Sequence, residues 1–258
     1  MSQAWMIASG KGGVGKSTVT ASLAVALARR QLSTVAVDTD IGLRSLDMLL
    51  GLHNRIVYDV IDVAQKDCKL KYALVQYMQD PALSLLPASQ LGTSADLTPE
   101  RMERIVRKLK KRFSYVLMDA PAGLEHGVTC ALESADHALI IATPDDVSIR
   151  DAERLISILE ANHKPRPMLV VNRVSPGLVK SGDMYSPQVV ANTLDIPLLG
   201  YVPEDPEVLR ALARHQTVMD VDCPARDAFM RISQRFLGEY VPMPSFRRKR
   251  FFIFNGRG

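Results

Sequence analysis

The chain has 258 residues, of which 47% are hydrophobic and 23% charged, and its formal net charge is +4. This length suffices for one large α/β domain or two small ones, and the hydrophobic content excludes a globally disordered chain. No apolar run reaches the roughly 18 residues of a transmembrane helix, and no secretory signal opens the sequence. The three cysteines, Cys68, Cys130 and Cys223, form neither a metal spacing nor a disulfide framework, which fits a reducing cytosol.

The positive charge is concentrated at the C-terminal end. Residues 241–258 contain five basic residues and no acidic residue, which leaves residues 1–240 with a net charge of −1. A nearly neutral body speaks weakly against a DNA-coating surface, so we expect no nucleic-acid partner.

The first motif, GKGGVGKST, fits the phosphate-loop pattern GxxxxGK[ST]. Its residues are Gly10, Lys11, Gly12, Gly13, Val14, Gly15, Lys16, Ser17 and Thr18. An apolar run precedes it and an alanine-rich helical stretch follows, over residues 17–30. Glycines let successive backbone N–H groups face one anion, Lys16 can reach the terminal phosphates, and the Ser17 hydroxyl can ligate Mg²⁺. The alternative, a glycine turn that joins a strand to a helix by chance, is disfavoured by this context.

Lys11 adds a second lysine to the loop, directly after Gly10. With it the loop resembles that of the deviant-Walker ATPases, the family of MinD, ParA and the nitrogenase iron protein. The resemblance implies a phosphate-loop NTPase fold that binds ATP and ADP with Mg²⁺. It also implies that Lys11 crosses a dimer interface and neutralises charge on the partner's nucleotide as the γ-phosphoryl departs. Taken alone, Lys11 would be a solvated loop lysine.

Two carboxylates follow the second predicted strand, residues 34–37. Asp38 and Asp40 stand at its C-terminal end, where α/β sheets bind ligands, although aspartates there also form turns and cap helices. We call residues 38–47 the switch segment. This segment resembles the MinD form of switch I. The resemblance implies that Asp40 positions the attacking water and contacts the Mg²⁺ shell, with Asp38 in support.

The middle of the chain carries less chemistry. We expect short helices around 58–63 and 71–75, a strand at 83–86, and a MinD-like phrase at 87–90. Thr98 and Pro99 open a basic helix that runs to about Arg112, with Thr98 as N-cap. Its cations could indicate nucleic-acid binding, but an apolar stripe on the same helix favours a solvated outer face.

Asp119 ends the next buried strand, 115–118, and is followed by a glycine-containing loop. Downstream of a phosphate loop this is the Walker B position, and it resembles switch II of the family, which implies that Asp119 holds a Mg²⁺-bound water. No cysteine occupies residues 69–129 to pair with Cys130 in a cluster, so the iron-protein alternative is set aside.

The second half continues the alternation with a strand at 137–143, a helix at 147–162, a strand at 168–171, a helix at 188–194 and a last helix at about 225–240. Arg150 and Asp151 resemble residues of the MinD helix that receives partner proteins, or else belong to a salt-bridged surface helix. Asn172 offers a donor and an acceptor for the edge of adenine, and Arg173 could stack on the ring. By resemblance the 201–205 loop completes this pocket through backbone groups, and its expected binding residues are Pro203 and Asp205.

The alternation of strands and helices from Ala4 to about Val202 predicts a doubly wound, mostly parallel sheet flanked by helices. We expect one ATPase domain, residues 1–241, and a basic, aromatic tail, residues 242–258. Tail cations would attract anionic lipids while its aromatics enter the interface, although the helical periodicity is imperfect. The expected membrane residues are Phe246, Arg247, Arg248, Lys249, Arg250, Phe251, Phe252, Ile253 and Phe254.

The MinD resemblance covers residues 4–240 and implies an ATPase that dimerises with ATP and sits reversibly on the inner face of the cell membrane. It also implies recruitment of a MinC-like division inhibitor, release by a MinE-like regulator, and a role in placing the division septum. Three alternatives remain open. They are a ParA-like DNA-segregation ATPase, a flagellar-number regulator that would carry an N-terminal activating extension, and a nucleotide-dependent scaffold without turnover.

Overall fold

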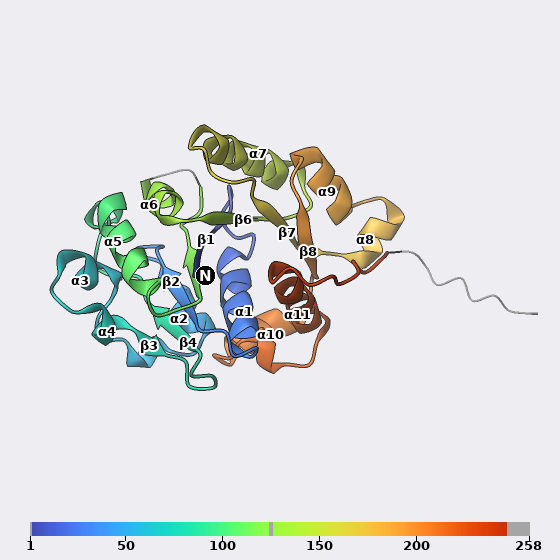
Figure 1. Ribbon diagram of the computed structural model, residues 1–258. Helices are drawn as coiled ribbons and strands as arrows, with labels where there is room; N and C mark the ends of the chain where they lie inside the picture. Colours follow the sequence, from blue (N-terminus) through green and yellow to red (C-terminus); the bar gives the residue numbers. More distant parts are fainter. Residues whose placement is uncertain (1, 124–125, 247–258) are drawn as a thin grey trace, which may run out of the picture.

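The computed structural model describes residues 2–123 and 126–246, and its centre is one eight-stranded sheet (Figure 1). The strand order is β3-β4-β2-β5-β1-β6-β7-β8, and every neighbouring pair is parallel except β3 with β4. The strands are β1 Gln3–Ala8, β2 Thr34–Asp38, β3 Val75–Gln76, β4 Leu83–Leu86, β5 Tyr115–Asp119, β6 His137–Ala142, β7 Met168–Val174 and β8 Leu198–Pro203. The predicted doubly wound, mostly parallel sheet is confirmed.

Helices cover both faces of the sheet. The helices are α1 Lys16–Ala28, α2 Leu46–Leu49, α3 Val60–Gln65, α4 Leu70–Ala73, α5 Pro99–Leu109, α6 His126–Ser134, α7 Asp146–Ala161, α8 Pro176–Ser181, α9 Pro187–Leu194, α10 Pro206–Ala213 and α11 Pro224–Phe236. Short 3₁₀ turns are η1 His53–Arg55, η2 Ser94–Asp96 and η3 Val218–Asp220. No described helix has the length and apolar character needed to cross a membrane.

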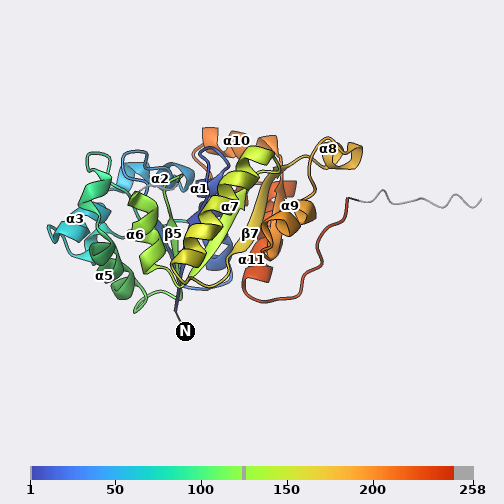
Figure 2. The same ribbon diagram turned by 90° about the horizontal axis from the view of Figure 1, so that it is seen from above.

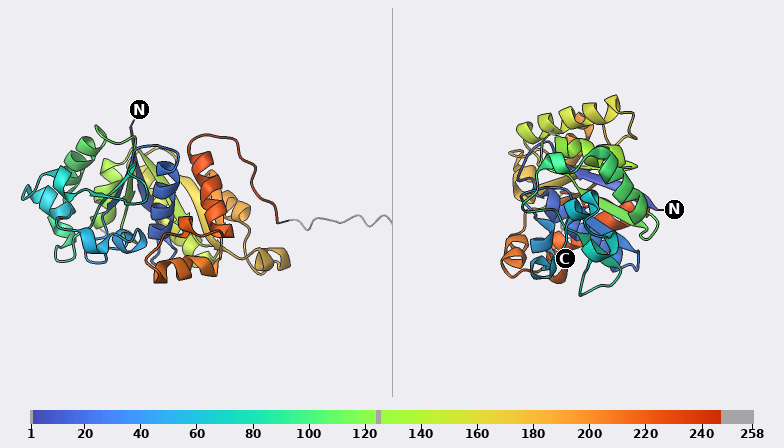
Figure 3. Two further views of the ribbon diagram at one scale, coloured as in Figure 1. Left: turned by 90° about the horizontal axis from the view of Figure 1, so that it is seen from below. Right: turned by 90° about the vertical axis from the view of Figure 1, so that its left-hand side faces the viewer.

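The core divides into two layers because successive strand residues point to opposite faces. In β1, Ala4 and Met6 pack in one cluster with residues of α5, α6, α7 and α9. Trp5 and Ile7 pack in the other cluster, with α1 and α11. Figures 2 and 3 show the consequence: α7 and α9 lie on one side of the sheet, while α1 and α11 lie side by side on the other.

Most expected elements are present with shifted ends. Thr98 caps α5 as predicted, since its hydroxyl accepts from the backbone N–H of Arg101. The last helix ends at Phe236 and not near Tyr240, because Gly238 adopts a left-handed φ of 84°, a conformation that commonly terminates helices. Six further elements, β3, β8, α2, α6, α8 and α10, were not predicted, and each has at most nine residues.

Candidate nucleotide-binding site

The phosphate loop joins β1 to α1 at the C-terminal edge of the parallel strands, which is where α/β sheets bind ligands. It opens into a cavity of about 600 Å³. The polar side chains that line this cavity are Ser9, Lys11, Lys16, Ser17, Thr18, Asp40, Arg44, Ser45 and Arg173. The structure therefore brings both loop lysines and Asp40 to the lining of one cavity.

Two glycines of the loop are required by close packing. A Cβ on Gly10 would lie 2.3 Å from the carbonyl oxygen of Asp151, so the loop rests directly on the backbone of α7. Gly15 has a φ of +89°, and a Cβ there would lie 2.3 Å from Nδ2 of Asn172. The loop is thus wedged between α7 and the end of β7, which fixes the direction of its N–H groups.

Lys16 forms a buried ion pair with Asp119. The Lys16 Nζ lies 2.8 Å from Oδ1 of Asp119, and the Thr20 hydroxyl donates to the same oxygen at 2.9 Å. Both charged side chains are almost fully buried. Sequence analysis missed Thr20, although its position four residues after Lys16 places both on one face of α1.

The site fits a magnesium ion by donor chemistry. Oδ2 of Asp119 is buried and has no hydrogen-bond partner in the structure, although buried carboxylate oxygens are normally satisfied. Ser17 and Asp40 line the cavity nearby and offer the oxygen ligands that Mg²⁺ prefers. Within residues 2–123 and 126–246, no group of three or more His, Cys, Asp or Glu side chains could hold a metal.

The carboxylate of Asp38 accepts three hydrogen bonds from the backbone of the switch segment. Its Oδ1 accepts from the N–H of Asp40 at 3.0 Å, and its Oδ2 accepts from Ser45 at 2.9 Å and Leu46 at 3.0 Å. Burial, followed by repulsion from Asp119, raises the pKa of Asp38 to about 7. Burial also raises the pKa of Asp40, which is half-buried. The support role expected for Asp38 thus has a geometric basis.

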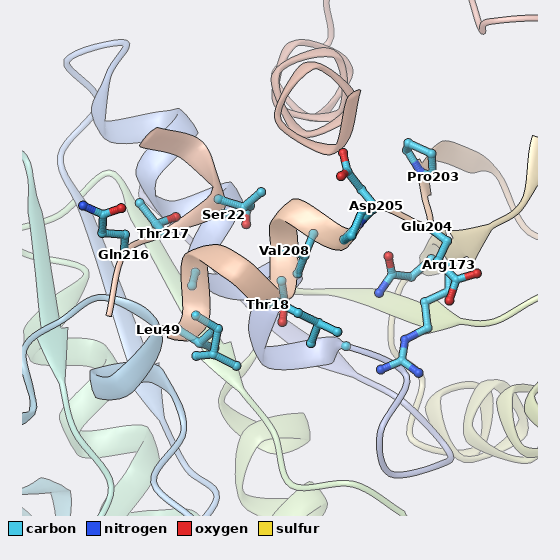
Figure 4. Close-up of a pocket in the computed structure, with 17 residues that line it drawn as sticks. Thr18, Ser22, Leu49, Arg173, Pro203, Glu204, Asp205, Val208, Gln216 and Thr217 are labelled. Atoms are coloured by element: carbon cyan, nitrogen blue, oxygen red, sulfur yellow. The ribbon is translucent and has the colours of Figure 1, made fainter. Parts of the chain in front are cut away.

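Beside the phosphate loop lies a second cavity of about 530 Å³ (Figure 4). Asn172, Arg173, Pro203 and Asp205 all line it, together with Leu49 of α2 and several residues of α10. Asn172 is buried and donates to the carbonyl oxygen of Val14 at 2.7 Å. Arg173 is exposed and has a φ of 55°, an uncommon conformation for a residue other than glycine.

Asp205 shapes this second cavity through the backbone. Its Oδ1 accepts from the N–H of Glu207 at the start of α10, and its Oδ2 accepts from the N–H of Ala225 at the start of α11, each at 3.0 Å. Both carboxylate oxygens are therefore engaged in holding two helices. That the 201–205 loop offers backbone groups to a base stays a prediction.

Lys11 is exposed and lines, besides the phosphate cavity, a cavity of about 450 Å³ together with Asp145. Burial opposes ionisation of Asp145, but hydrogen bonds from Thr143 and Ser148 and the charge of Lys11 hold its pKa below the usual value. Lys11 thus faces the N-terminus of α7.

Of the expected membrane residues, only Phe246 is within the described part of the chain, where it packs against Tyr201 with ring centroids 4.9 Å apart. Arg247, Arg248, Lys249, Arg250, Phe251, Phe252, Ile253 and Phe254 lie outside the described residues. The membrane role of the tail therefore stays a prediction.

Comparison with known proteins identifies the family. A model described as the CobQ/CobB/MinD/ParA nucleotide binding domain matches residues 5–218. The chain is 44% identical to the septum site-determining protein MinD of Helicobacter pylori, over 96% of this chain and 95% of that protein. It is 43% identical to MinD of Bacillus subtilis, over 94% and 92% of the two chains. The MinD fold in a MinC:MinD cell division protein complex from Aquifex aeolicus matches with a TM-score of 0.87 at 37% identity, covering 95% of this chain and 99% of that one. A MinD from Pyrococcus horikoshii complexed with Mg-ADP matches with a TM-score of 0.83 at 26% identity, over 92% and 96%.

Proposed function

This chain belongs to the CobQ/CobB/MinD/ParA nucleotide-binding family, and we propose that it is a MinD-type ATPase switch that helps to place the division septum. The observation that carries the proposal is the single cavity that Lys11, Lys16, Ser17 and Asp40 line together. The Lys16 cation, a hydroxyl and a carboxylate around one space suit a nucleoside triphosphate with its reacting water.

In this proposal each side chain has one task. Lys16 and the loop N–H groups bind the phosphates, while Asp40 orients the water that attacks the γ-phosphorus. Asp38 fixes Asp40 by accepting its backbone N–H. The raised pKa of Asp40 makes this carboxylate more basic than an ordinary aspartate, which suits a group that polarises water.

Magnesium would be held by Ser17, by Asp119 through its unpartnered Oδ2, and by the Asp40 side of the cavity. When bound, the ion would help to neutralise the charge that develops during phosphoryl transfer. Lys16 would then have to exchange its present partner Asp119 for phosphate oxygens.

Dimerisation follows from the position of Lys11 in the proposal. It is exposed and lines a cavity together with Asp145, the N-cap of α7, where a partner protomer could approach it. There it would contact the partner's phosphates, so that ATP holds two chains together until hydrolysis. Residues 242–258 would bind anionic lipids on the inner face of the cell membrane, because one weak anchor becomes effective when a dimer presents two.

The division partners are proposed from the relatives. A MinD is found with MinC in the complex named above, and this chain covers nearly all of that fold. We expect a MinC-like inhibitor as the cargo of the ATP dimer and a MinE-like regulator as the stimulator of hydrolysis. The whole cycle would move the chain between the cytoplasm and the membrane.

The test separates nucleotide binding from turnover. Lys16→Ala should abolish the ATP-dependent dimer in size-exclusion chromatography, because the phosphates lose their main cation. Asp40→Ala is the matched control, since it should keep the dimer while losing hydrolysis. A dimer that persists in Lys16→Ala, or normal hydrolysis in Asp40→Ala, would contradict the assignment.

The membrane step has its own experiment. Sedimentation with anionic liposomes should require both ATP and the tail, as judged against a chain truncated after Val241. Failure of the full chain to sediment would leave the ATPase assignment intact and would point to a DNA or soluble protein partner.

A further inference from the structure

The segment between α11 and the tail is held on the body. Residues 241–246, here called the strap, have no helix or strand, yet their carbonyl groups accept a set of hydrogen bonds from the body. Pro242 and Pro244 within the strap have no backbone N–H to donate, so carbonyl groups are well suited to fixing this segment.

One guanidinium makes most of these bonds. Arg235, in the last turn of α11, donates from Nε to the carbonyl of Val241 and from Nη2 to that of Pro242, each at 2.8 Å. Its Nη1 donates to the carbonyl of Leu199 in β8 at 3.2 Å. The planar fork of arginine can serve three acceptors at once, whereas the ammonium of lysine is a compact group with a different geometry.

Tyr201 holds the far end of the strap. Its hydroxyl donates to the carbonyl of Pro244 at 3.3 Å, and its ring stacks on Phe246 with centroids 4.9 Å apart. Both rings pack against the core cluster on the α7 side of the sheet. Tyr201 stands in β8 only two residues before Pro203, which lines the cavity beside the phosphate loop.

These contacts determine the path that the strap takes along the body. Helix α11 ends on the side where the N-terminus of the chain lies, away from the phosphate loop. The strap then runs back past α9 toward α8 (Figures 2 and 3). Six extended residues span up to about 20 Å, which is the length of a strand such as β8. Without the strap contacts, nothing described in the structure would hold residues 241–246 along this path.

We propose that Arg235 and Tyr201 are positioning residues that clamp the strap, and that the clamp delivers the tail to the nucleotide-binding edge of the body. This inference rests on the proposed ATP dimer and membrane tail. Two protomers that meet through their nucleotide sites would then release both tails near one seam, so that one flat membrane can bind both. Bivalent binding gains most when the span between the sites matches the reach of the anchors.

The first readout measures the strap in solution, without lipid. Ser245 is exposed, so Ser245→Cys can carry a nitroxide label in a Cys68→Ser background, with Cys130 and Cys223 buried. Electron paramagnetic resonance should show an immobilised label in the otherwise native chain. Arg235→Lys, which keeps the charge but not the fork, should mobilise it. A label already mobile before this substitution would overturn the inference.

The second readout is ATP-dependent sedimentation with phosphatidylglycerol vesicles. Arg235→Lys should weaken vesicle binding by roughly tenfold, because part of the bivalent gain is lost, while ATP-dependent dimerisation persists. Arg231→Lys is the matched control on the same helix and should change neither readout. Normal vesicle binding by a mobilised Arg235→Lys strap would overturn the inference alone. Failure of the unsubstituted chain to bind vesicles would instead overturn the membrane part of the proposed function.

Discussion

Replacing Gly10 by alanine should open the seam between the phosphate loop and α7. The new Cβ would lie 2.3 Å from the carbonyl oxygen and 2.4 Å from the carbonyl carbon of Asp151. These are backbone atoms inside a 16-residue helix, so no side chain can swing aside. The loop and the helix would have to separate by about 1 Å to reach the 3.4 Å of an ordinary contact.

Overpacking of this kind typically costs about 1–3 kcal/mol, and in a chain of this size each kcal/mol lowers the melting temperature by roughly 2–4 °C. Urea unfolding of the nucleotide-free protein measures the change directly. Gly12→Ala is the matched control in the same loop, because its Cβ would meet only the Cβ of Ala122, at 3.9 Å. If Gly10→Ala lost less than about 0.5 kcal/mol relative to that control, the close approach of loop and helix described here would be incorrect.

Three further substitutions test the site. Asn172→Ala removes the 2.7 Å hydrogen bond to the Val14 carbonyl. We therefore expect the free energy of unfolding, measured in urea, to fall by about 1–3 kcal/mol, and nucleotide binding, measured by calorimetry, to weaken. Unchanged values for both would refute the role of this bond. Asp205→Ala removes the carboxylate that caps α10 and also accepts a hydrogen bond from the start of α11. Loss of the cap alone should lower the free energy of unfolding by about 0.5–2 kcal/mol. An equally stable variant would show that neither bond matters. Burial raises the pKa of Asp38 from 3.8 to about 7, so the folded protein retains a proton there that the unfolded chain releases. The contribution of Asp38 to stability should therefore decline as pH rises from about 4 to 7, and Asp38→Asn should flatten that part of the curve in urea titrations at successive pH values; parallel curves would contradict the assigned shift.

Regular, local patterns made the fold predictable from sequence. The buried strands are short apolar runs, and Thr98 and Pro99 indicate the start of α5. Elements that depend on tertiary partners were missed. Strand β3 has only two residues and exists because it pairs with β4, while α10 begins where Asp205 accepts from two separate helices. Neither the pairing of β3 with β4 nor the two hydrogen bonds to Asp205 can be predicted from the neighbouring residues in the sequence.

Some features of the candidate site could also be predicted from the sequence, and others could not. The loop, Asp40, Asp119 and Asn172 could be proposed from sequence because each lies at or near the end of a predicted strand. The contact of Gly10 with Asp151 joins residues 141 positions apart in the chain, and the bond from Thr20 to Asp119 spans 99 positions. The three N–H groups that converge on Asp38 depend on the path of the switch segment. Only the folded chain reveals such contacts.

The ion pair between Lys16 and Asp119 connects these observations to the proposed cycle. Two buried charges 2.8 Å apart stabilise each other, and removing one partner would leave the other unpaired at high cost. The charges of a nucleotide and its metal offer replacements of the right sign for both, since phosphate suits Lys16 and a divalent cation suits Asp119. Binding of only one component would leave the other buried charge uncompensated, so nucleotide and metal should bind cooperatively. Thr20, which donates to the same oxygen of Asp119, would hold the carboxylate in place during that exchange.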